Sequence, residues 1–228
     1  MRVIIVGNCG SGKTWVANKL ARIAGSRVIH LDDIYWEPGS FDKERSPEAI
    51  DTMIEASKFS GSWIVEGVFG ELAERFIERA ETLIWLDIDW ATCRERLLKR
   101  GSESTKHMNR TQSAEGLDDL MEWASHYDKR LDAQSHEGHK RLMNNFHGEK
   151  LHLTLEAEVI NMIEKARQGY FKQHEEQLLT AKSAKDTNLN CSHEGTKGAK
   201  GPRELKEKVE GKRPREPSKG NTEDTDEG

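Results

Sequence analysis

A glycine-rich stretch near the amino terminus carries the residue types that bind phosphate. Residues 7–14 read GNCGSGKT and match the pattern GxxxxGK followed by Ser or Thr. In such a loop the backbone N–H groups can point at a phosphate, because glycines leave room where a side chain would collide. Lys13 would supply a cation for the β- and γ-phosphates, and the Thr14 hydroxyl could bind Mg²⁺. The residues predicted to contact the nucleotide are Gly7, Asn8, Cys9, Gly10, Ser11, Gly12, Lys13 and Thr14.

The elements on either side of this loop agree with that prediction. Residues 2–6 are dense in β-branched side chains and predict a strand, whereas residues 13–24 have apolar side chains at helical spacing and end at Gly25. A phosphate loop needs a strand before it and a helix after it, because the positive end of the helix faces the anion. We interpret Cys9 as a tolerated loop residue rather than a redox centre.

Further apolar runs predict the rest of a sheet. They are residues 27–32, 63–67, 82–88 and 150–155. Their near-continuous apolar character indicates strands covered on both faces, as in a parallel sheet. Helical patterns lie between them, one opened by Ser46 and another by Asp89, and such alternation gives right-handed crossovers. The sequence therefore predicts an α/β domain over residues 1–170, with a five-stranded parallel sheet flanked by helices.

Two segments depart from the alternation of strands and helices. Residues 101–116 are polar and predict a lid over the site, followed by a helix over residues 115–131 with Leu131 on its apolar stripe. Residues 178–228 have no aromatic side chain, and their charges nearly cancel. Such a segment cannot bury enough apolar surface to offset the cost of ordering it, so we predict a disordered tail.

Composition excludes several classes of partner. The net charge of −5 gives no overall attraction to nucleic acid, so we do not expect nucleic acid as a partner. Three cysteines without CxxC spacing fit a reducing compartment, and the first residues predict a strand rather than a secretion signal. No apolar run approaches the roughly 20 residues that cross a bilayer. We therefore expect a cytoplasmic protein without a membrane segment, whose oligomeric state the sequence leaves open.

Acidic residues follow several of the predicted strands. Glu66 ends the third strand and could hold Mg²⁺ together with Thr14, because ligands bind where the carboxyl ends of parallel strands meet. Asp32 and Asp33 follow the second strand and should project from the same edge, although Asp33 could instead cap the next turn. Asp87 offers similar chemistry from the fourth strand or could cap a helix.

The order of the motifs resembles a known family. No NKxD or LSGGQ motif is present, and the glycine loop is followed by HLDDIYWEPGSF, WIVEGVFG, TLIWLDID, CRERLLKR and SHEGHKRLMNNFHGEKLHL. This order resembles the adenylate-kinase-like small P-loop kinases over about residues 1–165, and among them the bacterial proteins often labelled topology modulation proteins. The resemblance implies transfer of the γ-phosphate of ATP, with Mg²⁺, to a small-molecule acceptor.

The resemblance also implies roles for charged residues outside the loop. Asp32 would contact the acceptor or the magnesium shell. Arg96 and Arg100 lie four residues apart on one predicted helix and would contact ATP and the transferred phosphate, where negative charge develops. Arg110, in the predicted lid, is a weaker candidate for the same role.

Three more residues are candidates for binding the acceptor. Arg45 and Arg75 could clamp a carboxylate or phosphate, and Trp36 could stack on a ring. The acceptor could also be a nucleoside monophosphate, although residues 67–70 read GVFG where adenylate kinase has Gly-Phe-Pro-Arg. A third possibility is a nucleotide-gated binding protein with little turnover.

Overall fold

The computed structural model of the chain describes residues 1–39, 43–59, 61–101 and 110–169, with the backbone alone described over 110–115. The predicted tail, residues 178–228, lies outside the described residues. Half of the predicted lid, residues 102–109, lies outside them as well. In the part of the chain that is described, no helix has the length and apolar character needed to span a bilayer.

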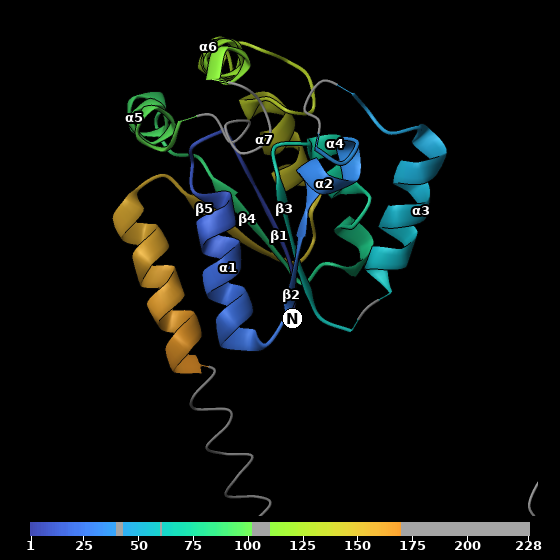
Figure 1. Cartoon of the computed structure of the whole chain (residues 1–228). Coiled ribbons are helices and arrows are strands. Elements are labelled where there is room, and N and C mark those ends of the chain that lie inside the picture. Colours follow the sequence, from blue (N-terminus) through green and yellow to red (C-terminus); the bar gives the residue numbers. More distant parts are fainter. Residues whose placement is uncertain (40–42, 60, 102–109, 170–228) are drawn as a thin grey trace, which may run out of the picture. The chain divides into compact units, whose positions relative to one another are not determined.

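Five strands form one parallel sheet in the order β2-β3-β1-β4-β5 (Figure 1). The strands are β1 Arg2–Gly7, β2 Arg27–His30, β3 Trp63–Gly67, β4 Thr82–Leu86 and β5 Glu149–Leu153. Central β1 pairs with β3 and β4, so both of its sides are hydrogen-bonded and almost all of its residues are buried. The predicted five-stranded parallel sheet is confirmed.

Helices cover both faces of this sheet. The first group of helices is α1 Lys13–Ala24, α2 Leu31–Tyr35, α3 Pro47–Lys58 and α4 Gly70–Glu74, followed by a short 3-10 helix at Ile77–Arg79. The second is α5 Trp90–Arg100, α6 Arg110–Ser125 and α7 His136–Asn145, and residues 156–169 are also helical. Along β1, Val3 and Ile5 pack with α1 and residues 156–169, whereas Ile4 and Val6 pack with α3, α4 and α7.

Local signals set the ends of several helices where the sequence predicts them. The Ser46 side chain accepts from the backbone N–H of Ala49 at the start of α3, and Asp89 caps α5 in the same way. Gly25 ends α1 in the left-handed conformation, with φ of 61°. These helix ends depend on neighbouring residues only, which is why their positions agree with the sequence.

Several predicted elements differ from the structure. The strands expected over residues 82–88 and 150–155 are Thr82–Leu86 and Glu149–Leu153. The second strand ends at His30 rather than residue 32, because Leu31 begins α2 and is buried there. The helix expected over 115–131 is α6, which starts at Arg110 in the predicted lid and ends at Ser125. Leu131 is therefore 75% exposed instead of facing the core. The chain turns after Ser125 because buried Tyr127 hydrogen-bonds to Trp85 and His139.

Candidate active site

Three glycines give the loop after β1 its shape. Gly7, Gly10 and Gly12 have φ values of 152°, 81° and 99°, which side chains disfavour. A Cβ on Gly7 would lie 2.4 Å from the carbonyl oxygen of Leu86, and one on Gly10 would lie 2.4 Å from that of Cys93. The backbone of the loop therefore packs directly against the last residue of β4 and against α5, and only glycine fits at both positions.

The loop holds its lysine and its asparagine by hydrogen bonds. Lys13 Nζ donates to the carbonyl oxygen of Asn8 at 2.9 Å, so the ammonium lies over the loop at the start of α1. The Asn8 side chain accepts from the backbone N–H of Cys9 at 2.8 Å and donates to the carbonyl oxygen of Ala124 at 3.0 Å. Asn8 thus links the loop to the end of α6.

A hydroxyl and a carboxylate meet directly after the loop. Thr14 Oγ1 donates to Glu66 Oε1 at 3.0 Å, and Glu66 is only 3% exposed. Both oxygens are of the kind that Mg²⁺ binds, usually with substrate phosphates and water completing its shell. The described residues contain no group of three or more acidic, histidine or cysteine side chains suited to a metal. Because substrate phosphates and water can complete the Mg²⁺ shell, these two residues suit a metal that arrives with a nucleotide.

His30 completes this cluster, and the sequence did not single it out. His30 and Glu66 are register partners on β2 and β3, and the Nδ1 and Oε1 atoms lie 2.6 Å apart. The hydrogen bond to Glu66 raises the pKa of His30 against the opposing effect of burial. Burial alone would raise the pKa of Glu66, but the bond to His30 and the charge of Lys13 outweigh it and lower that pKa. Glu66 is therefore ionised, as a metal ligand needs to be.

Charges gather around the Cys9 thiol inside the loop. Burial raises the pKa of Cys9, Lys13 opposes that effect most strongly, and Asp32 adds to it. Arg100 and Arg130 also oppose the rise in the pKa of Cys9, more weakly than Lys13 does. A thiol with a raised pKa stays protonated near neutrality, which supports the interpretation of Cys9 as a loop residue and not a redox centre. The sequence analysis singled out Lys13, Asp32 and Arg100 among these four charged residues, but not Arg130.

Arg130 is the charge that the sequence did not single out. Its guanidinium carbon lies 3.7 Å from the centroid of the Trp123 ring, and Nη2 donates to the carbonyl oxygen of Gln134 at 3.1 Å. Its buried Nε has no hydrogen-bond partner among the residues that the structure describes. Its Nη1 pairs with Asp132 Oδ2 at 3.7 Å, so Trp123, Gln134 and Asp132 together hold the guanidinium in place.

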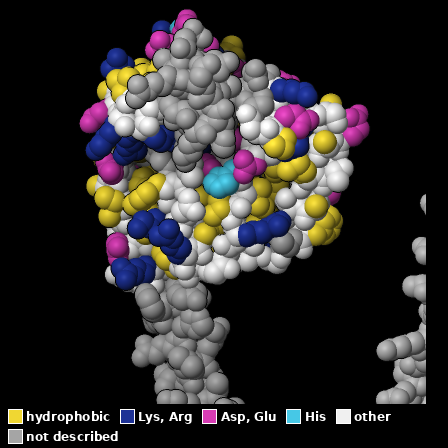
Figure 2. Space-filling view, viewed as in Figure 1, with side chains coloured by type: hydrophobic (Ala, Val, Ile, Leu, Met, Phe, Trp, Pro, Cys, Tyr) yellow, Lys and Arg dark blue, Asp and Glu magenta, His cyan; other side chains and the backbone are white. Residues whose placement is uncertain are grey.

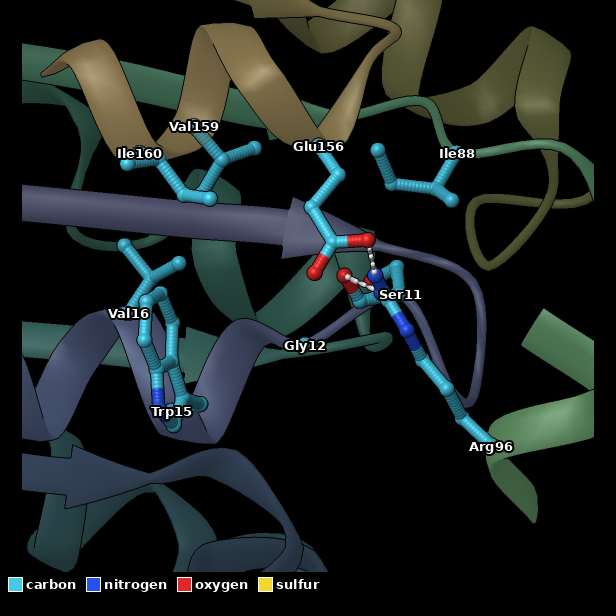
Figure 3. Close-up of a pocket in the computed structure, with 9 residues that line it drawn as sticks. All are labelled: Ser11, Gly12, Trp15, Val16, Ile88, Arg96, Glu156, Val159 and Ile160. Carbon is cyan, nitrogen blue, oxygen red and sulfur yellow. Dashed lines mark hydrogen bonds and ion pairs between the residues drawn. The ribbon is translucent and has the colours of Figure 1, made fainter. Parts of the chain in front are cut away.

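Arg96 contacts the loop through its backbone carbonyls. Its Nη1 donates to the carbonyl oxygens of Ser11 at 3.1 Å and Gly10 at 3.5 Å, and its Nη2 pairs with Glu156 Oε2 at 3.2 Å. These groups border a cavity of about 290 Å³ (Figure 3). The cavity is lined by Ser11, Gly12, Trp15, Val16, Ile88, Arg96, Glu156, Val159 and Ile160.

A second groove continues from this cavity between α1 and residues 156–169. Its cationic lining residues are Lys19, Arg22 and Arg167, and it shares Trp15, Glu156 and Ile160 with the cavity. Figure 2 shows dark blue lysine and arginine side chains gathered over these two helices. Positive charge thus extends from the cavity along α1.

The predicted acceptor residues lie around α2. Asp32 is in the first turn of α2, and Trp36 follows its last residue and packs against Tyr35 and Phe69. The two arginines each pair with an acid. Arg45 binds Glu37 at 3.3 Å, and Arg75 binds Asp51 at 2.6 Å. Asp32 therefore lies at the start of α2, directly after the carboxyl end of β2, whereas Arg45 and Arg75 already have anionic partners.

A protein-family model, AAA_18, described as an AAA domain, matches residues 3–118. No curated protein matches the chain. The solved structures that resemble it include three kinases.

A gluconokinase from Sinorhizobium meliloti 1021 is 14% identical, with a TM-score of 0.38, and the match covers 78% of this chain and 96% of that one. A shikimate kinase from Acinetobacter baumannii in complex with shikimate is 14% identical, with a TM-score of 0.43 and coverage of 76% and 94%. A deoxyadenosine kinase from M. mycoides with bound dATP is 14% identical, with a TM-score of 0.41 and coverage of 72% and 98%. Because the family model spans just over half of the sequence, this chain belongs to the AAA_18 family of AAA domains.

Proposed function

We propose that this protein transfers the γ-phosphate of ATP, with Mg²⁺, to a small-molecule acceptor. The observation that carries this function is the contact between the Thr14 hydroxyl and the Glu66 carboxylate, 3.0 Å apart and directly after the phosphate loop. These oxygens would hold Mg²⁺, with the nucleotide phosphates and water as its other ligands. When bound, the ion neutralises charge on the β- and γ-phosphates.

The chain's own residues would hold the triphosphate. The loop amides and the positive end of α1 would bind its phosphates. Lys13 can exchange the Asn8 carbonyl, 2.9 Å away, for a phosphate oxygen because its four-carbon stem is flexible. The transferred phosphate develops negative charge that convergent cations stabilise. Arg100 and Arg130 are the candidates, since Arg100 ends α5 and Arg130 stacks on Trp123, next to the Ala124 carbonyl that binds Asn8 of the loop.

The base of the nucleotide would enter the cavity beside the loop (Figure 3). Ser11 and Gly12 line one part of this cavity, and apolar side chains such as Val159 line another. A flat ring bound between apolar walls would leave its phosphates at the loop. Arg96 would then stabilise the loop through the carbonyls of Gly10 and Ser11 instead of contacting the transferred phosphate.

The acceptor would bind on the α2 side of the loop. Asp32 could accept a hydrogen bond from an acceptor hydroxyl, and Trp36 with Phe69 would provide apolar contact. Arg45 and Arg75 would bind an anionic acceptor by exchanging their present carboxylate partners. The order of the sequence motifs supports a relationship to adenylate-kinase-like enzymes and topology modulation proteins. We also propose a cytoplasmic location.

Turnover of ATP tests this function. Purified protein is mixed with Mg²⁺, ATP and a panel of sugars, hydroxy acids and nucleotides, and ADP formation is measured. We expect transfer that Lys13→Ala abolishes, because the phosphates lose their mobile cation. Lys58→Ala is the matched control, since Lys58 ends α3, pairs with Glu55 at 2.7 Å and should leave transfer unchanged. A wild-type protein that neither binds nor turns over ATP would end the proposal.

Two other outcomes identify the rival functions. ADP formation that depends on AMP, CMP, UMP or a deoxy counterpart would identify a nucleoside monophosphate kinase. Binding of ATP without turnover on any acceptor would favour the nucleotide-gated binding protein.

A further inference from the structure

The cavity beside the phosphate loop has apolar walls and a carboxylate beside them. Val16 on α1 lines one wall, and Ile160 on the helix over residues 156–169 lines the other. Figure 3 shows Glu156 beside these walls, with its carboxylate directed toward Arg96. The volume of about 290 Å³ is near the lower end of ligand pockets, so the cavity suits a single ring system and not a whole nucleotide.

Glu156 is held at this cavity by contacts that lead to the phosphate loop. Arg96 Nη2 pairs with Glu156 Oε2 at 3.2 Å, and Arg96 Nη1 donates to the carbonyl oxygens of Ser11 at 3.1 Å and Gly10 at 3.5 Å. This ion pair engages one oxygen of the carboxylate and leaves Oε1 for a ligand. The Glu156 side chain is 68% exposed, so it lies at the mouth of the cavity, where a bound base would meet it.

A second polar group in the cavity also calls for a ligand. Ser11 is 3% exposed and lines the cavity, and its Oγ has no hydrogen-bond partner among the residues that the structure describes. A buried hydroxyl without a partner costs free energy, which a ligand that supplies the partner would recover. A carboxylate can only accept hydrogen bonds, whereas a hydroxyl can also donate. The two groups therefore match a ligand that brings a donor to Glu156 and an acceptor to Ser11.

Resting on the proposed function, we infer that Glu156 selects the base of the nucleotide by accepting a hydrogen bond from the exocyclic amine of adenine. Adenine carries this N–H donor next to a ring nitrogen that accepts, so its edge matches a carboxylate beside a hydroxyl. A purine without the amine would leave the Oε1 atom of Glu156 unpaired. A purine with a carbonyl oxygen at the same position would place that oxygen against the carboxylate and be disfavoured.

Calorimetric titration with two triphosphates tests this inference without knowledge of the acceptor. The probes are the Mg²⁺ complexes of ATP and of purine riboside 5′-triphosphate, which differs from ATP only by the missing amine. We expect the wild type to bind ATP about fivefold more tightly, the effect of one solvent-screened hydrogen bond to a charged group. In Glu156→Ala the two affinities should agree within about twofold. Because both nucleotides carry the same triphosphate, any disturbance of Arg96 or of the loop changes both affinities and leaves their ratio unaltered.

Glu164→Ala is the matched control for this titration. Glu164 is an exposed glutamate on the same helix that lines the neighbouring groove but not the cavity, so its variant should keep the wild-type preference for ATP. Equal affinities for the two triphosphates in the wild type, or a full preference for ATP in Glu156→Ala, would overturn the inference and leave the proposed function standing. A wild-type protein that binds neither triphosphate would refute the proposed function, and the inference with it.

Discussion

Replacing His30 by asparagine removes a titrating group while leaving a hydrogen-bond donor near Glu66. Asparagine suits this position because its amide nitrogen is attached to Cγ, like the Nδ1 atom that lies 2.6 Å from Glu66 Oε1. A hydrogen bond to a charged group contributes about 1.5–3 kcal/mol to stability, and a neutral one about 1 kcal/mol. His30 is 35% exposed, and solvent screens the pair, so we expect a net loss of about 1 kcal/mol in His30→Asn.

The loss should depend on pH. The pKa of His30 is raised above its ordinary 6.5, so its contribution is complete below pH 6.5 and disappears as the pH rises through the folded-state pKa. The pKa of Glu66 is lowered below its ordinary 4.5, so its contribution is complete above pH 4.5 and disappears at more acidic pH. The difference in free energy of unfolding between the wild type and His30→Asn should therefore be largest between pH 4.5 and 6.5, and it should become smaller at alkaline pH.

Thermal unfolding across this pH range measures the effect. A loss of 1 kcal/mol lowers the melting temperature of a domain of this size by about 2–4 °C. His30→Ala serves as the comparison, because it removes the donor as well as the charge and should stay destabilised at alkaline pH. A difference in melting temperature between the wild type and His30→Asn that is constant with pH, or that grows as the pH rises, would refute the ion pair between His30 and Glu66.

Three further predictions concern the loop, the metal and the acceptor. Gly10→Ala should lose on the order of 3 kcal/mol of stability in denaturant titration and bind Mg-ATP poorly, because the new Cβ would lie 2.4 Å from the Cys93 carbonyl at a φ of 81°. Thr14→Ala should raise the Mg²⁺ concentration that gives half-maximal ATP turnover about tenfold, because the loss of one ligand costs about 1.4 kcal/mol of binding free energy. An unchanged dependence of turnover on Mg²⁺ would count against this site. Arg75→Ala should change the free energy of unfolding by less than about 1 kcal/mol, because its pair with Asp51 is exposed, and should raise the KM of an anionic acceptor but not of a neutral one.

The phosphate loop and the sheet could be predicted from the sequence because their signals are local. The glycines at 7, 10 and 12 and the lysine after them are adjacent in the chain, and each has its own steric or electrostatic reason. The strands are short apolar runs, and their burial in a parallel sheet follows from that pattern. Glu66 was predicted in the same way, as the acid that ends a strand.

Tertiary structure alone decided which distant residues meet these local elements. His30 reaches Glu66 because β2 and β3 are neighbours in register, and Asn8 reaches Ala124 across 116 positions of sequence. Whether Arg96 or Arg130 acts on phosphate depends on how α5 and the chain after α6 pack around the loop. Arginines on an exposed helix look alike in sequence whether or not they bind phosphate, so no local signal distinguishes Arg96 from Arg130. Packing, which is a property of the whole domain, makes that choice.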